Sequence, residues 1–296
     1  MTQSPDTIRS DGGLVTHAEL PVPPHREKWH IMSIPITMME YRLSVRNRWV
    51  IALTAVFATF ALGLITFSGA PVGPEGYARI IASLAVLAVY LVPLAALAFG
   101  YDSIVGAAES GWLQSLLALP IQRDRIVRSV YLGRALALAS AIVIGFGIAG
   151  LMLIQGLGML GWEGFASFLV ATVALGIVFL GIAVLISTVC AQKAHALGAS
   201  LVVWAWFILV HDLLALGLIA AFRLPEAAIA TMVITNPAGV YRVLVLGQLG
   251  AGGDAGFASV LATAGLSTPL LVGALIAWAV IPIVLAGQLI KRRGFA

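Results

Sequence analysis

The sequence is poor in charged residues and has almost no cysteine. Only 10% of its 296 residues are Asp, Glu, Lys or Arg, whereas 60% are hydrophobic. Soluble domains usually carry about 25% charged residues, so this chain has too few to cover a globule with a polar surface. Cys190 is the single cysteine, which excludes an intrachain disulfide and a multi-thiolate metal site. This composition argues against a soluble enzyme and predicts an all-α integral membrane protein.

Six long apolar stretches follow a polar beginning. Residues 1–30 contain no apolar run, and we expect them to form a disordered cytoplasmic tail. A helix needs about 20 residues to cross the hydrocarbon core, and each later stretch is long enough. The six predicted spans are residues 49–67, 80–100, 135–162, 165–192, 196–222 and 255–290. The sequence therefore predicts one six-helix membrane domain over residues 31–296.

The basic residues predict the orientation of these spans. If the N-terminus is cytoplasmic, 14 Lys and Arg residues lie on the inner side. Only Arg79, Arg223 and Arg242 then lie on the outer side. Cytoplasmic loops are enriched in Lys and Arg, so both termini are predicted to be cytoplasmic.

An amphipathic helix is predicted before the first span. Met38, Tyr41 and Val45 recur at spacings of three and four, and arginines occupy other faces. Pro35 suits the first turn of a helix. We expect this helix to lie in the inner membrane interface. The alternative is a positively charged flank with no further role.

Two connections are too long to be simple turns, and the first is the inner loop over residues 101–128. Leu113, Leu116 and Leu117 give part of this loop an apolar face, and Pro120 ends it. The other inner loops are too short to cover that face. We therefore expect lipid head groups or a partner protein to cover it.

The second long connection is the outer segment over residues 223–254. Pro225 and Pro237 interrupt an apolar sequence whose parts are too short to span a membrane. This pattern predicts a short re-entrant or interfacial helix pair that breaks at Asn236-Pro237, before the last span. Tyr241 and Arg242 are candidates for contact with an outer partner or for a structural role. Alternatively, Tyr241 anchors at the interface and Arg242 extends toward the head groups.

A single charge interrupts the predicted spans. Asp212 lies beside His211 in the fifth apolar stretch. A central carboxylate costs about 2.5–3.5 kcal/mol on insertion scales, so such residues usually face a bundle interior or cavity. The pair could form a polar gate or a proton-linked site. Alternatively, Asp212 is protonated, caps a helix that restarts there, or lies nearer the membrane surface.

The inner loop resembles that of a known transporter family. The run Glu109-x-Gly111-x-Leu113, then Leu116-Leu117-x-x-Pro120, Arg123, Ile126 and Gly133-Arg134 is similar to the first cytoplasmic loop of type-2 ABC exporter permeases. Two further strings resemble the NosY-type permeases of transporters that help mature nitrous oxide reductase. They are Tyr101-Asp102-x-Ile104-Val105-Gly106 and Asn236-Pro237-x-x-x-Tyr241-Arg242. Trp112 and Arg134 depart from the family pattern, which more often has threonine and lysine there.

This resemblance implies a multi-pass permease of the bacterial inner membrane. It implies a second copy of the chain, a cytoplasmic NosF-like ATPase, a periplasmic β-helical NosD-like protein and a role in copper-site maturation. The ATPase-coupling residues would be Glu109, Gly111, Trp112, Leu113, Leu116, Leu117, Pro120 and Arg123. The outer-partner residues would be Asn236, Pro237, Tyr241 and Arg242.

The chain itself cannot carry the phosphate-binding loop of an ATPase. That loop ends in Gly-Lys-Ser/Thr, but Lys28, Lys193 and Lys291 are the only lysines and none follows a glycine. ATP and Mg²⁺ are therefore expected on a separate ATPase, and no cofactor or metal is expected here. The alternatives are an exporter of a lipid or drug, a passive scaffold and a membrane redox subunit. No paired ligands support the redox subunit, and the basic charge does not indicate nucleic-acid binding.

Overall fold

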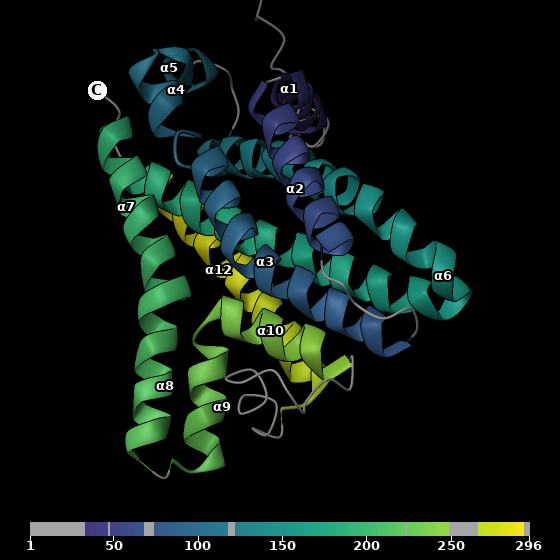
Figure 1. Cartoon of the computed structure of the whole chain (residues 1–296). Helices are drawn as coiled ribbons and strands as arrows, with labels where there is room; N and C mark the ends of the chain where they lie inside the picture. Colours follow the sequence, from purple (N-terminus) through teal and green to yellow (C-terminus); the bar gives the residue numbers. More distant parts are fainter. Residues whose placement is uncertain are drawn as a thin grey trace, which may run out of the picture.

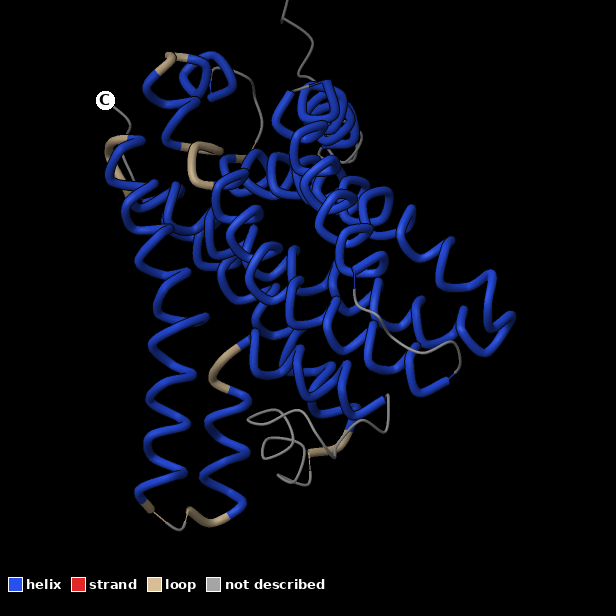
Figure 2. Tube along the Cα trace, in the orientation of Figure 1, coloured by secondary structure: helices blue, strands red, loops and turns tan. Residues whose placement is uncertain are grey.

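The computed structural model describes residues 33–46, 48–67, 74–117, 122–222, 224–248 and 266–292. The predicted tail over residues 1–30 lies outside them. Within these ranges the regular structure is helical (Figure 2). Six helical segments are long and apolar enough to cross a membrane, as the sequence predicts. They are Arg48–Phe67, Gly76–Glu109, Arg123–Leu153, Trp162–Val189, Lys193–Ala221 and Thr268–Arg292.

Figure 1 shows the helices in their order along the chain. Their bounds are α1 Ser33–Arg46, α2 Arg48–Phe67, α3 Pro74–Gly100, α4 Val105–Glu109, α5 Trp112–Leu117, α6 Arg123–Val189, α7 Lys193–Ala205, the π-helix η2 Trp206–Val210, α8 His211–Ala221, α9 Glu226–Ile234, α10 Pro237–Gln248 and α12 Thr268–Arg292. Helix α3 begins six residues before the predicted start of the second span. The last begins at Thr268 rather than at 255, and residues 255–265 lie outside the described ranges.

Helix α6 contains the third and fourth spans, which fold back on each other. The rings of Phe146 and Phe168 have centroids 5.5 Å apart. In a straight helix, the 22 residues between them would cover about 33 Å, at 1.5 Å per residue. The two halves of α6 therefore lie side by side, as Figure 1 shows. With α3 and α12 they enclose the core, in which Phe57, Phe165 and Phe179 are also buried.

A stripe of small residues lets α2 approach this core closely. The stripe comprises Ala137, Ala141, Gly145 and Ala149, and its alanines are buried. A methyl group on Gly145 would lie 2.6 Å from Cβ of Phe57, too close for a real contact. The stripe is thus an intrasubunit seam, in which the lack of a side chain allows close helix packing.

Helix α1 lies across α6 and is the predicted helix before the first span. A Cβ on Gly133 would lie 2.5 Å from Cβ of Glu40, so the backbone of α1 rests on α6 there. The apolar residues of the predicted face are divided. Tyr41 faces the protein, with its hydroxyl 3.5 Å from Ser140 Oγ, whereas Met38 and Val45 are exposed. Only part of that face is left to meet lipid.

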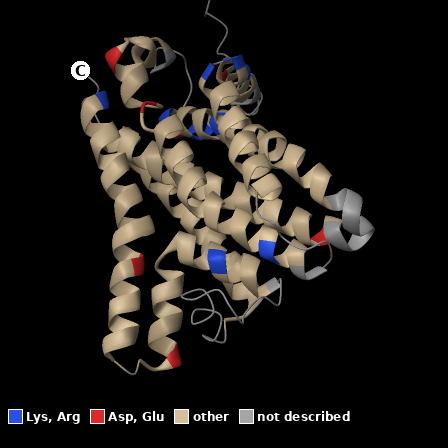
Figure 3. Ribbon diagram, viewed as in Figure 1, with Lys and Arg blue, Asp and Glu red and all other residues tan. Residues whose placement is uncertain are grey.

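The basic residues gather at the end of the molecule that α1 occupies (Figure 3). We call this the α1 end, and the opposite end, where α8 meets α9, the α9 end (Figure 1). The described basic residues on elements of the α1 end are Arg42, Arg46, Arg48, Arg123, Arg125, Arg128, Arg134, Lys193, Lys291 and Arg292.

The fifth span stands at the side of the bundle. Only 11% of the most apolar stretch of this span is buried within the chain, whereas 61% of the corresponding stretch is buried in the span that contains α3. After α9 the chain bends by 110° into α10, which packs on α3, α6 and α12. The predicted break at Asn236-Pro237 is confirmed, because α9 ends at Ile234 and α10 begins at Pro237.

Candidate functional sites at the two ends of the bundle

Helices α4 and α5 cap the α1 end and are fixed to α6 by a distant serine. Ser187, near the end of α6, accepts hydrogen bonds from the backbone N–H groups of Ile104 and Val105, at 2.9 and 3.0 Å. These are N–H groups that a helix start leaves unpaired. The N-cap residue of α4 is Ile104, which makes no side-chain cap of its own. Ser187 thus couples the position of α4 to the fourth span.

The end of α4 is held in turn by the start of α7. The Glu109 carboxylate accepts a hydrogen bond from the Lys193 backbone N–H at 2.8 Å, and the Lys193 ammonium lies 4.0 Å from it. A carboxylate at a helix N-terminus is favoured by the helix dipole. Glu109 is predicted to orient an ATPase, but in this chain it already binds α7. A Cβ on Gly106 would lie 2.9 Å from Lys193 Cε, so α4 and α7 are in close contact.

The turn between α4 and α5 exposes one large side chain and buries another. Gly111 has φ +76°, a conformation that glycine adopts without the steric cost of a Cβ. Trp112 is 47% exposed, but Leu113 is 1% exposed and belongs to the core. The expectation that Leu113 lacks cover within the chain is therefore wrong. The side chains of Leu116, Leu117 and Pro120 lie outside the described part, and Arg123 begins α6 half-buried.

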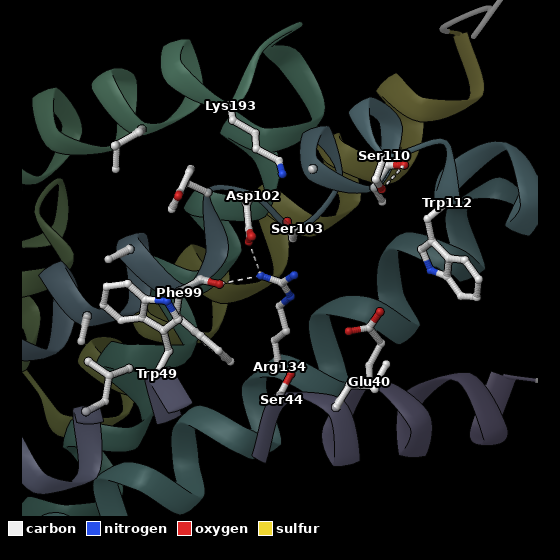
Figure 4. Close-up of a pocket in the computed structure, with 18 residues that line it drawn as sticks. Glu40, Ser44, Trp49, Phe99, Asp102, Ser103, Ser110, Trp112, Arg134 and Lys193 are labelled. Carbon is white, nitrogen blue, oxygen red and sulfur yellow. Dashed lines mark hydrogen bonds and ion pairs between the residues drawn. The ribbon is translucent and has the colours of Figure 1, made fainter. Parts of the chain in front are cut away.

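An ion pair joins the loop after α3 to α6. Arg134 donates to Asp102 Oδ1 and to the Phe99 carbonyl, each at 2.6 Å (Figure 4). Its guanidinium also lies over the Phe99 ring, 5.6 Å from the centroid. Asp102 and Arg134 belong to two separate strings of the family resemblance, Tyr101-Asp102 and Gly133-Arg134. In the fold they contact each other. Charge-assisted hydrogen bonds of this kind are stronger than neutral ones, so they fix the loop to α6.

A second cluster lies where α8 meets the bend before α10. Asp212 Oδ2 and the Arg242 guanidinium are 2.5 Å apart, with their side chains 20% and 10% exposed. The Asn236 amide nitrogen lies 3.1 Å from His211 Nδ1 and 3.5 Å from Asp212 Oδ1. Four residues predicted as two unrelated groups thus form one cluster. Asp212 does not cap a restarting helix, because the N-cap of α8 is Val210 and makes no side-chain cap.

Asn236 also links the π-helix to the start of α10. Its amide donates to the Phe207 carbonyl at 2.8 Å, and its side-chain oxygen accepts the Ala238 N–H at 2.9 Å. Asn is a preferred N-cap residue, and Pro237 suits the first helical position. Short π-helical turns are rare and occur frequently at functional sites. One side chain therefore fixes both the irregular turn of the fifth span and the bend.

Tyr241 is completely buried, with 0% exposure. Its hydroxyl lies 2.9 Å from Thr172 Oγ1 on α6. Neither direct contact with an outer partner nor anchoring at the membrane interface fits this position, so both interpretations of Tyr241 are wrong. Arg242 is 9% exposed and pairs with Asp212, so the extension of Arg242 toward head groups is wrong as well. These two residues are structural in this chain.

The family comparison matches almost the whole membrane domain. Residues 34–294 match the model of the ABC-2 family transporter proteins. The chain belongs to the ABC-2 transporter family. Its relatives include two proteins named probable ABC transporter permease protein NosY. The one from Stutzerimonas stutzeri is 37% identical and the one from Pseudomonas aeruginosa 33%. Each alignment covers 87% of this chain and 97% of the relative.

As an ABC-2 permease, the chain is the membrane subunit of an ABC transporter, similar to NosY. It is a multi-pass inner-membrane protein, and the family implies an ATPase partner and a dimer. Sequence reasoning finds the loop but misses Ser187 and Thr172, which hold α4 and Tyr241 in place. Both lie in apolar spans without a distinctive motif, and only their position beside unpaired polar groups could have identified them.

Proposed function

We propose that this ABC-2 permease transmits the motion of a separate cytoplasmic ATPase from α4 and α5 to the α9 end. In this proposal ATP and Mg²⁺ bind to the ATPase, and the chain itself catalyses no reaction and holds no cofactor. The α1 end, with both termini, faces the cytoplasm, since Lys and Arg accumulate on cytoplasmic segments. A passive scaffold, which is the alternative, would not need α4 and α5 to be fixed to the spans at this end.

The observation that carries the proposal is the way the α4–α5 cap is anchored. It is bonded to α6 through Ser187 and to α7 through Glu109, and the Arg134–Asp102 pair fixes the loop that leads into it from α3 to α6. A push on this cap would therefore reach several spans together instead of being absorbed by a flexible loop. Trp112 remains exposed on this cap. Tryptophans that a partner protein buries often contribute a large share of the binding energy of an interface.

The names of the relatives support a more specific role. By similarity to NosY, the ATPase would be NosF-like, the outer partner a periplasmic β-helical NosD-like protein, and the process copper-site maturation of nitrous oxide reductase. A second copy of the chain would complete the transporter. The cluster around Asn236 and the bend into α10 would present the outer surface indirectly, because Tyr241 and Arg242 are buried.

Co-purification tests the proposal. Trp112→Ala should weaken binding of the ATPase to the permease in detergent extracts by about thirtyfold, because a central tryptophan can contribute about 2 kcal/mol or more. Trp162→Ala is the matched control, since Trp162 is 50% exposed on another part of the chain. Equal loss with both variants, or no loss with Trp112→Ala, would contradict the proposal. Membrane insertion of each variant is checked in the membrane fraction.

The alternative is an exporter of a lipid or drug with the same coupling loop. Both functions predict ATPase capture through Trp112, so that experiment does not separate them. Deletion of the gene in a denitrifying host separates the two functions. A NosY-like function predicts loss of copper from nitrous oxide reductase, whereas a lipid or drug exporter leaves the reductase loaded.

A further inference from the structure

A cavity of about 640 Å³ opens at the α1 end between α1, α2, α3, α6 and α7, beneath the α4–α5 cap (Figure 4). Pockets that hold small molecules typically enclose about 300–1,000 Å³. Charged groups of both signs line it, together with aromatic and aliphatic side chains from the membrane-facing helices. A volume of this size with mixed lining suits an amphiphilic ligand.

Two buried donors in this cavity have no partner within the described part of the chain. Ser103 is 4% exposed and its hydroxyl makes no hydrogen bond, and the Arg134 Nε is likewise buried and unbonded. Figure 4 shows Ser103, Asp102 and Arg134 close together. A buried polar group without a partner costs about 1–3 kcal/mol, so a ligand that accepts these hydrogen bonds would remove the cost.

The Lys193 ammonium adds a positive charge to the same cavity. It lies 4.0 Å from the Glu109 carboxylate, beyond hydrogen-bond distance, and its side chain is 45% exposed. A hydroxyl, a guanidinium N–H and an ammonium thus line one cavity. This combination of donors is suited to the oxygens of a phosphate group.

Glu40 supplies the opposite charge. Its carboxylate makes no hydrogen bond or ion pair with the residues that the structure describes, although it lines the cavity. Burial raises the pKa of Glu40, while the Arg134 charge opposes that shift. Asp102 is already paired with Arg134, so Glu40 is the carboxylate available to a cationic group. The ligand should therefore carry a positive charge besides its anionic one.

The apolar part of the lining is continuous with the membrane-facing surface. Trp49 and Leu43 are 67% and 57% exposed, and Leu53 and Leu197 come from α2 and α7. Tryptophan is enriched at the head-group level of membranes, and α1 lies at the start of the first span. An acyl chain could leave the cavity along these side chains without meeting water.

We propose that this cavity binds the head group of a phospholipid with a primary amine, such as phosphatidylethanolamine. The phosphate accepts hydrogen bonds from Ser103 and Arg134 and pairs with Lys193. The ammonium group donates to Glu40, and the acyl chains run along Trp49, Leu53 and Leu197. The bound lipid would fill the space between α1 and the α4–α5 cap and so stabilise the cap.

Lipid titration of the delipidated full-length chain tests this site. Dioleoyl phosphatidylethanolamine should raise the melting temperature more than dioleoyl phosphatidylcholine, whose quaternary amine cannot donate, or dioleoyl phosphatidylglycerol, which has no amine. Glycerophosphoethanolamine, the head group without acyl chains, should have little effect. Native mass spectrometry should show one tightly retained lipid per chain.

Two variants assign the contacts. Glu40→Gln should remove the preference for phosphatidylethanolamine over phosphatidylcholine, and Ser103→Ala should weaken every phospholipid by about tenfold or more, the value of one hydrogen bond to a charged group. The controls are Glu226→Gln at the start of α9 and Ser83→Ala on α3, whose hydroxyl bonds to the Arg79 carbonyl outside the cavity. Both should behave as the unmodified chain.

Four results would overturn the proposal. These are equal stabilisation by the three phospholipids, a lipid preference unchanged by Glu40→Gln, and full stabilisation by glycerophosphoethanolamine, which would indicate a soluble phosphate site. The fourth is lipid binding that appears only after deletion of residues 2–30, which would mean that the chain's own N-terminal segment occupies the cavity.

Discussion

Asp212 and Arg242 form an ion pair 2.5 Å long that ties the fifth span to α10. Each would be an isolated charge in an apolar setting without the other, and such charges are costly at membrane depth. Asn236 and His211 complete the cluster. The pair therefore holds the bend between α9 and α10 against the bundle.

Removal of one partner should destabilise the chain. Arg242→Met leaves the Asp212 carboxylate unpaired and should lower the free energy of unfolding by about 3 kcal/mol. Adding Asp212→Leu to this variant removes the uncompensated charge and should restore most of the loss. Thermal melting in detergent measures both. If the double variant melts no higher than the single one, the pair is not what holds the bend.

Ser187 should determine how firmly α4 is attached. Ser187→Ala leaves the Ile104 and Val105 N–H groups without their acceptor, at a cost of about 1–3 kcal/mol. We expect faster amide exchange at these two residues and weaker coupling of ATP hydrolysis to the permease. Ser83→Ala on α3, whose hydroxyl bonds to the Arg79 carbonyl away from the cap, is the control. Unchanged exchange would show that the serine contributes nothing to the cap.

Tyr241 should affect stability rather than partner contact. Tyr241→Phe removes the hydrogen bond with Thr172 and should cost about 1 kcal/mol while periplasmic partner capture persists. Tyr241→Ala opens a cavity worth about 3–5 kcal/mol, so any loss of capture with it reflects unfolding. Melting and capture are measured on the same preparations. Lost capture by Tyr241→Phe at unchanged stability would restore a contact role.

Glu40 should make stability depend on pH. Burial raises its pKa above the ordinary value of 4.5, so the folded chain binds more protons than the unfolded chain just above that value. Stability should therefore fall as pH rises through this window, and the penalty should persist at neutral pH. Glu40→Gln should remove this slope in the delipidated chain. If the melting temperatures of the unmodified chain and Glu40→Gln change equally with pH between 4.5 and 7, the assignment is contradicted.

The sequence alone determined the spans and the position of the long loop over residues 101–128. Transfer of a side chain from water to hydrocarbon is a property of that residue and its neighbours, so the spans follow from runs of apolar residues. The break at Asn236-Pro237 was equally accessible, because proline removes a backbone donor and restricts the residue before it. These are local effects, and the structure places them within a few residues of the prediction in most cases.

Only the tertiary structure decided which polar groups meet. Asp212 pairs with Arg242, Asp102 with Arg134, and Glu109 with Lys193 at the start of α7, although these partners lie 30, 32 and 84 residues apart in the sequence. Burial was equally hidden from the sequence, because Leu113 and Tyr241 were expected to be exposed but are buried. The partner and the burial of a side chain depend on where helices cross. Helix crossings are set by the packing of whole faces, such as Gly133 against α1 and Gly145 against α2, rather than by any single residue.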